Sequence, residues 1–175
     1  REELENNRVA LIQKVGENVS PRRGKGIKAP IVGSYVHSNN RIAALVGIEG
    51  GTEELAREIA MHVTAVNPIV ISSKDMPTEI IEAEKEIYLV QARESGKSDD
   101  IIDKMVSGRV KKFLKENSLV DQPYVKNPDI TVGQLIADSD SKVLSFQRFE
   151  VGEGIKTEET DFAAEVAAQM ESVSK

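Results

Sequence analysis

Residues 28–37 precede a turn and predict a β-strand, whose side chains fall on two faces with a period of two. One face of that strand is expected to carry Ile31, Gly33, Tyr35 and His37. Residues 38–40, Ser-Asn-Asn, predict a turn because asparagine tolerates a positive φ angle and bonds to nearby backbone. Residues 42–46 are apolar on both faces, which is typical of a strand covered on both sides. The pattern therefore predicts two strands around a turn.

On both sides of these strands, apolar residues recur every three or four positions, which indicates helices. Residues 1–15 form the first expected helix, and Gly16 ends it. Thr52 is the expected cap of a second helix, which stops at Asn67-Pro68. The apolar face of this second helix includes His62, which we interpret as a buried, hydrogen-bonded core histidine.

Two further apolar stripes predict an antiparallel helical hairpin over residues 77–117. The first helix is expected to present Ile80, Ala83, Ile87 and Val90, and the second Ile102, Val106, Val110 and Phe113. The connecting loop contains Gly-Lys-Ser at 96–98. It is not a P-loop, because Gln91 stands where the first glycine is required and a helix precedes it. A narrow hairpin projects from a domain more easily than it packs inside one. It serves either as a docking element or as a structural arm.

The remaining pattern completes an α+β fold. Residues 69–71 predict a short strand, and Thr131 caps a short helix over 132–137. Residues 143–151 alternate and are expected to join the sheet begun at Ala29, with Val143, Ser145, Gln147 and Phe149 on one face. A last helix is expected over 162–170. We therefore predict a small antiparallel sheet packed with helices, a protruding antiparallel helical hairpin (a coiled coil) and a C-terminal helix.

Composition narrows the function. The 175 residues carry a net charge of −6, which argues against a general nucleic-acid binder. The chain has no cysteine, which excludes disulfides and thiolate chemistry and fits a cytoplasmic location. No apolar run approaches the roughly 18 residues of a membrane helix. With two histidines and no recognisable nucleophile motif or metal-ligand spacing, we expect no enzyme activity, no metal and no cofactor. We therefore expect the protein to act by binding a partner.

One basic, glycine-rich segment precedes the first strand. It includes Arg22, Arg23, Lys25 and Lys28, which could contact phosphate in a small RNA-binding domain. No aromatic residue is interleaved for base stacking, so we favour a solvated connector.

Several stretches, in order, resemble the C-terminal two-thirds of bacterial elongation factor Ts, the guanine-nucleotide exchange factor for elongation factor Tu. They are RVALIQKVGENVSPRR, VGSYVHSNNRIAALV, GGTEELAREIAMHV, KMVSGRVKKF, SLVDQPYV, TVGQL and RFEVGEGIKTEETDFAAEVAAQ. Together they are highly specific and cover nearly all of the chain. The family's α+β core, coiled-coil arm and C-terminal helix agree with the fold expected from the residues.

The resemblance also implies boundaries. They are 1–28, the tail of the N-terminal core subdomain; 29–76 with 118–154, the C-terminal core subdomain; 77–117, the helical hairpin insertion; and 155–175, a C-terminal docking module. The sequence opens at Arg1 inside a helical pattern, so we expect part of a longer protein. The family's N-terminal helical domain and its upstream T-D-F-V wedge have no counterpart here. Residues 160–163 resemble that string but lie in the C-terminal helix, so the wedge role is not transferred to them.

The resemblance further implies residues that contact elongation factor Tu. Val15 and Gly16, in the K-V-G-E-N turn, are expected to touch its GTPase domain, and His37 is expected to face the same partner. Val125, which closes Q-P-Y-V, is expected on the surface that meets the partner's third domain. In the last helix, either Gln169 or Met170 is expected to pack on the GTPase domain. Local alternatives are a helix stop at Gly16 and a core-covering strand residue at Val125.

The implied function is to bind elongation factor Tu·GDP and to promote GDP release, so that GTP can bind. Such a factor weakens nucleotide binding by the same coupling free energy that it gains from the nucleotide-free partner. We expect this chain to bind but to exchange poorly, because it carries no counterpart of the wedge. A homodimer through the hairpin can coexist with that role. The alternatives from other classes are a purely structural dimerisation module and a small RNA-binding domain that uses the basic segment.

Overall fold

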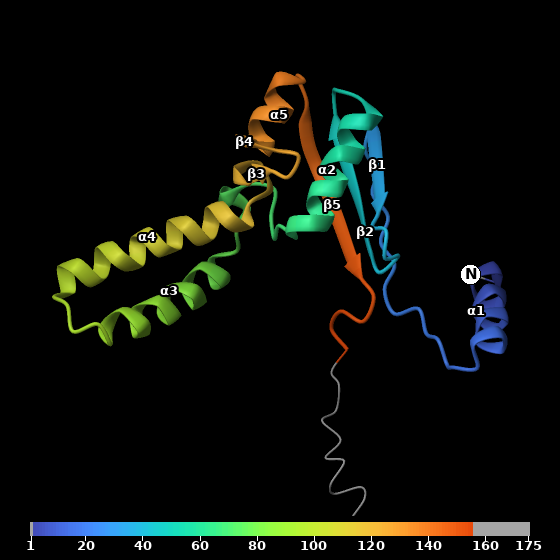
Figure 1. Cartoon of the computed structure of the whole chain (residues 1–175), viewed down its shortest axis with the longest axis horizontal. Coiled ribbons are helices and arrows are strands. Elements are labelled where there is room, and N and C mark those ends of the chain that lie inside the picture. Colours follow the sequence, from blue (N-terminus) through green and yellow to red (C-terminus); the bar gives the residue numbers. More distant parts are fainter. Residues whose placement is uncertain (1, 156–175) are drawn as a thin grey trace, which may run out of the picture.

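The computed structural model describes residues 2–155 (Figure 1). Its helices are α1 (Glu2–Val15), α2 (Glu53–Val66), α3 (Thr78–Arg93), α4 (Asp99–Asn117) and α5 (Val132–Asp138). Its strands are β1 (Ile31–Val36), β2 (Ile42–Glu49), β3 (Pro123–Tyr124), β4 (Asn127–Thr131) and β5 (Lys142–Glu150). The expected C-terminal helix, with Gln169 and Met170, lies outside the described residues. The α+β fold class is confirmed.

β1, β2 and β5 form an antiparallel sheet in that order. The β1–β2 turn closes with a hydrogen bond of 2.9 Å from the His37 N–H to the Ile42 carbonyl. Asn40 takes a φ of 53°, as the turn prediction requires. β5 pairs with β2, so residues far apart in the sequence complete the sheet and the predicted joining of this strand is confirmed.

α2 packs across one face of the sheet, against β1 and β2. The helix begins where predicted, since Thr52 Oγ1 accepts a hydrogen bond of 3.1 Å from the Leu55 N–H. Gly33 of β1 permits the close approach, because a Cβ atom there would overlap the backbone of Ala56 and Arg57. The core between the sheet, α2 and α5 includes Val46, Ile48, Ile59, Val63, Val132 and Ile136.

The second face of the sheet is only partly covered. On β2, Ala43 and Leu45 are half-buried, whereas Val46 and Ile48, on the face toward α2, are fully buried. Residues 27–29 cross the sheet near Gly47, where a Cβ atom would come within 2.7 Å of the Ala29 side chain. The expectation that β2 is covered on both sides is therefore correct for one face only.

A β-bulge in β5 changes the predicted faces of that strand. Gly47 pairs with Ser145, but the next residue, Ile48, pairs with Val143, which leaves Leu144 as the extra residue. Val143 therefore faces the core, where it is 5% exposed, and it does not share a face with Ser145. The predicted alternation was wrong at this one position because a bulge resets the period of two.

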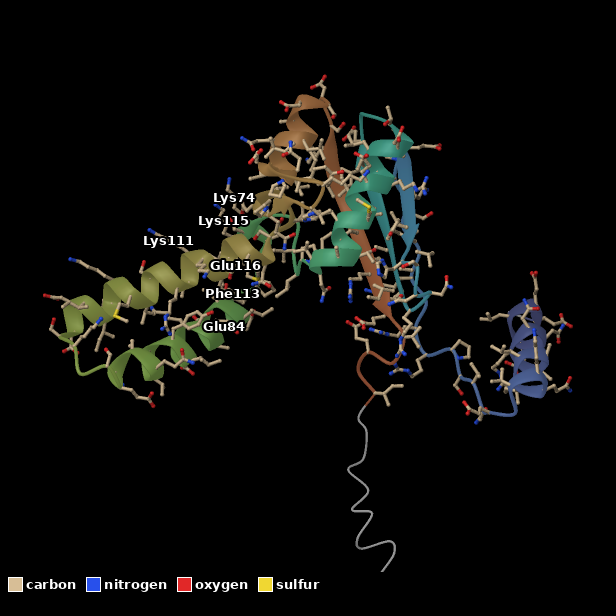
Figure 2. The ribbon with its side chains drawn as sticks, viewed as in Figure 1. Lys74, Glu84, Lys111, Phe113, Lys115 and Glu116 are labelled. Atoms are coloured by element: carbon tan, nitrogen blue, oxygen red, sulfur yellow. The ribbon has the colours of Figure 1, made fainter. Side chains whose placement is uncertain are left out.

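α3 and α4 form the predicted antiparallel hairpin, which projects from the sheet at the left of Figure 1. The expected face of α4 is confirmed: Ile102 and Val106 are buried, and Figure 2 shows Phe113 directed toward α3. The expected face of α3 is wrong. Tyr88, Leu89 and Ala92 pack against α4, whereas Ile87 and Val90 are 49% and 60% exposed. The run of apolar residues at 87–90 fits several helix faces, and the small Ala92 lets α4 approach on one of them.

Residues 69–71 do not form the predicted strand. They make one parallel bridge, between Val70 and Ser118, and the Leu119 N–H donates a 2.9 Å hydrogen bond to the Val70 carbonyl. Leu119–Asp121 is a 3₁₀ turn, so the partner segment coils away and the ladder cannot extend.

α1 ends as predicted, because Gly16 takes a φ of 77° and its N–H bonds to the Ile12 carbonyl at 2.8 Å. The helix has no buried residue, and Figure 1 shows it apart from the sheet. Within residues 2–155, the helices are either too short or too polar to cross a membrane.

Candidate functional site

His62 lies at the centre of a buried hydrogen-bond network beneath the segment that carries Val125. Its side chain is 0% exposed, and its Nε2 lies 2.9 Å from Gln122 Oε1. The Val125 N–H donates to His62 Nδ1 at 3.3 Å. Gln122 in turn donates through Nε2 to the Glu116 carbonyl at 2.6 Å, so α2 and α4 are joined to the two residues that flank β3. The predicted buried, hydrogen-bonded histidine is confirmed.

A second cluster covers this network toward the solvent. Glu58, one turn before His62, accepts a hydrogen bond of 2.7 Å from Lys126 Nζ and another of 3.2 Å from the Tyr124 hydroxyl. The bond from Lys126 lowers the pKa of Glu58. Burial, together with the nearby Glu58 carboxylate, raises the pKa of Tyr124 to about 12. Both groups therefore keep their ordinary charge states at neutral pH, and the cluster ties residues 124–126 to α2.

His37 follows β1 and is half-buried, with its ring centroid 6.3 Å from that of Tyr35. Tyr35 and Lys126 line one hollow of about 220 Å³, together with Arg57, Glu58 and Met61 among others. Val125, next to Lys126, is 44% exposed. His37 and Val125 therefore each adjoin a residue that lines this hollow: His37 lies beside Tyr35, and Val125 is next to Lys126 in the chain. We call this surface, defined by Tyr35, His37, Arg57, Met61, Val125 and Lys126, the α2 margin.

Val15 and Gly16 lie elsewhere. Val15 is 52% exposed, and a Cβ atom at Gly16 would meet no other atom within 4 Å. The structure does not bring this turn to the α2 margin. Gln169 and Met170 fall outside the described residues, so the structure gives no placement for them.

The basic segment makes intramolecular contacts. Arg22 donates to the Glu153 carbonyl at 2.7 Å, and Arg23 pairs with the Glu153 carboxylate at 2.9 Å. The Arg23 guanidinium also lies 4.9 Å from the centroid of the Phe149 ring. Two of the four basic groups of this segment are therefore engaged by the chain itself, which favours the connector interpretation.

Sequence reasoning did not identify several residues that shape the α2 margin. Gln122, Tyr124 and Lys126 gave no periodic signal because they lie in an extended stretch around Pro123. Glu58 fell on the polar side of the α2 pattern. The available hint was the isolated His62 on an apolar face, since a buried imidazole requires polar partners on both ring nitrogens.

The fold and the exposed surface first define the general class of this protein. The described residues form an α+β domain with a projecting helical arm and an exposed margin held by buried hydrogen bonds. Residues 2–155 contain no group of three or more His, Asp or Glu residues that could hold a metal ion. Exposed apolar side chains on ordered backbone, such as Val125, are of the kind that protein interfaces use.

The comparisons give the family. The family model described as "Elongation factor TS" matches residues 1–153, and the chain belongs to that family. Elongation factor Ts of Saccharophagus degradans is 58% identical over 171 residues, which are 97% of this chain and 59% of the relative. Elongation factor Ts of Marinobacter nauticus is 57% identical, over 95% of this chain and 57% of the relative. For that of Cellvibrio japonicus the identity is 54%, over 99% of this chain and 60% of the relative. The chain therefore spans about three-fifths of the length of these curated relatives.

Proposed function

We propose that this chain binds elongation factor Tu and takes part in guanine-nucleotide exchange, with GDP released so that GTP can bind. The observation that carries the proposal is the family match over residues 1–153, combined with the exposure of the residues that the resemblance implies. Val15 and Val125 are 52% and 44% exposed although both are apolar. Exposed apolar side chains next to ordered backbone are suited to a protein interface. In this role the protein is an exchange factor rather than an enzyme, and it works in the cytoplasm.

The core of residues 29–76 and 118–154 supplies the proposed contacts of His37 and Val125, and the turn after α1 supplies those of Val15 and Gly16. In the 155–175 docking module, Gln169 or Met170 adds a contact with the GTPase domain. Because linkage is reciprocal, a chain that prefers nucleotide-free elongation factor Tu must weaken GDP binding by the same factor. No residue of the chain needs to exchange a proton or form a covalent bond in this role.

We further propose that this chain binds well and accelerates exchange poorly. The contacts proposed for the residues of this chain are those of docking surfaces, and the wedge role is not assigned to residues 160–163. Binding without full acceleration is the expected behaviour of docking contacts that have similar affinity for the nucleotide-bound and the nucleotide-free partner.

The test is release of a fluorescent GDP from elongation factor Tu, with and without the chain, alongside direct titration of binding. We expect measurable binding with little acceleration. Full acceleration would refute the assignment of exchange to the wedge, and an absence of binding would refute the proposed function. His37→Ala and Val125→Ala should weaken binding, whereas Gly24→Ala, at a position where a Cβ atom meets nothing within 4 Å, is the matched control.

Homodimerisation through the hairpin is a second proposal. Ile87 and Val90 on α3 are 49% and 60% exposed, and Ile101 on α4 is 46% exposed, so each helix of the arm presents apolar surface. Light scattering over a range of concentrations tests it: Val90→Lys should reduce an observed dimer to monomer. A mass that stays monomeric at every concentration would refute it.

A further inference from the structure

In the hydrogen bonds around His62, only one assignment of donors and acceptors is possible. A backbone N–H can only donate, so the bond from Val125 requires His62 Nδ1 to be an acceptor without a proton. The ring proton is then on Nε2, which donates to Gln122 Oε1 at 2.9 Å. The Gln122 amide is oriented accordingly, since its Nε2 donates to the Glu116 carbonyl at 2.6 Å. Each of these polar groups is satisfied in this arrangement, and reversing the ring tautomer or the Gln122 amide would set donor against donor at one bond and acceptor against acceptor at another.

The acceptor at His62 Nδ1 holds the backbone of Val125. Val125 is the first residue of the two-residue turn between β3 and β4, which the pairing of Tyr124 with Asn127 closes, so the Val125 N–H lies outside the strand ladder and bonds elsewhere. The bond to His62 Nδ1 is the hydrogen bond that fixes the backbone of Val125 over α2. The Val125 side chain is 44% exposed, whereas His62 below it is 0% exposed. A buried imidazole therefore sets the height and direction of an exposed apolar side chain.

We infer that His62 is a positioning residue for partner binding: through Nδ1 it holds the Val125 backbone so that the Val125 side chain is presented on the α2 margin. The inference rests on the proposed function, in which Val125 contacts elongation factor Tu. His62 does not touch the partner. It reduces the ordering cost that the 122–126 segment would otherwise contribute to association.

Two substitutions at His62 separate this role from a merely structural one. His62→Asn places an amide oxygen near the position of Nδ1 and keeps an acceptor for the Val125 N–H, but it loses the bond to Gln122. His62→Gln reaches the position of Nε2 and keeps the bond to Gln122, but it leaves the Val125 N–H without its acceptor. Both variants shrink a buried ring and both lower stability. Val63→Ala, at a fully buried core position on the same helix, is the control for lost stability alone.

The experiment measures three quantities for the full chain: urea unfolding, hydrogen exchange of the Val125 amide, and the Kd for elongation factor Tu·GDP. We expect His62→Gln to speed exchange at Val125 and to raise the Kd about five- to tenfold, the scale of one hydrogen bond. His62→Asn should keep both values near those of the wild-type chain, as should Val63→Ala. An increase in Kd that follows lost stability equally in all three variants would overturn the positioning role.

The wild-type chain provides two further outcomes. If it does not bind elongation factor Tu at all, the proposed function fails, whereas binding with equal Kd values for both His62 variants refutes only the positioning role. The ¹⁵N chemical shifts of the His62 ring give a test that needs no variant to fold. Protonation at Nε2 alone supports the inference, and protonation at Nδ1 overturns it because such a ring cannot accept from Val125.

Discussion

Gly33 of β1 lies directly under Ala56 of α2, so closely that a Cβ atom on Gly33 would overlap the Ala56 backbone. The clash involves backbone rather than a flexible side chain, so the helix as a whole would have to move. We predict that Gly33→Ala lowers the free energy of unfolding by about 3 kcal/mol or prevents folding, the upper range for overpacking a core. Urea unfolding followed by circular dichroism would measure the loss.

Gly24→Ala is the matched control for this prediction, because a Cβ atom at Gly24 meets nothing within 4 Å. It should leave the unfolding free energy within about 0.5 kcal/mol of the wild-type value. A Gly33→Ala variant as stable as the control would show that α2 can shift on the sheet at little cost.

The stability of the domain should depend on the protonation of His62. Burial is the main cause that lowers the pKa of His62 from its ordinary value of 6.5, and the hydrogen bond with Gln122 opposes it only in part. The folded state therefore binds a proton less readily than the unfolded state, and the stabilising contribution is fully present above pH 6.5. It is lost as the pH falls below that value toward the lower pKa of the folded state. We predict a lower unfolding free energy at pH 5.5 than at pH 7.5.

The groups that face His62 keep their charge states over this pH range, so a variant without the imidazole is the control. Gln122 and the Val125 N–H do not titrate, the raised pKa of Tyr124 keeps its phenol neutral, and the lowered pKa of Glu58 keeps its carboxylate charged over this range. His62→Asn removes the titrating ring and should flatten the dependence of the unfolding free energy on pH between 5.5 and 7.5. An unchanged slope in that variant would assign the effect to another group.

The fold could be predicted from the sequence wherever a local signal determines the structure. Thr52 and Gly16 mark helix ends by their own chemistry, and the β1–β2 turn follows from Asn40. The errors arose where a partner element makes the choice. The face that α3 presents depends on α4, and Val143 faces the core because of a bulge against β2. Neither partner is visible in a local period of two or 3.6.

In the candidate site, too, some residues could be predicted from the sequence and others could not. The sequence singled out His62 as a buried, hydrogen-bonded histidine, and the structure places it so. Its partners Gln122 and Val125 are 60 or more residues away in the sequence, and only tertiary packing brings them to the ring. His37 and Val125 were selected by resemblance, and their common position on the α2 margin could not be inferred from spacing.

The arm contains a helix position where glycine has no packing role. Gly108 lies inside α4, and a Cβ atom there would meet nothing within 4 Å. Alanine lacks the backbone entropy cost of glycine in a helix, so we predict that Gly108→Ala stabilises α4 by about 0.8–1 kcal/mol. Hydrogen exchange of the α4 amides should slow by a factor of about four to five. Faster exchange would mean that the helix requires flexibility at this point for a reason other than packing.

Lys111 and Lys115 lie one turn apart on α4, and Figure 2 shows both on the side of the helix that faces away from α3. Like charges at this spacing destabilise a helix, whereas glutamate four residues before lysine stabilises it. Lys111→Glu should therefore slow exchange of the α4 amides, with a gain of about 0.5–1 kcal/mol that shrinks in 1 M salt. Lys112→Glu is the reversed control, because Lys112 already pairs with Glu116 at 3.6 Å and the change places two carboxylates together. The opposite signs distinguish pairwise electrostatics from any general effect of lowering the net charge, which both substitutions change equally. If both variants shift α4 exchange in the same direction, the charge pattern along the helix does not control its stability.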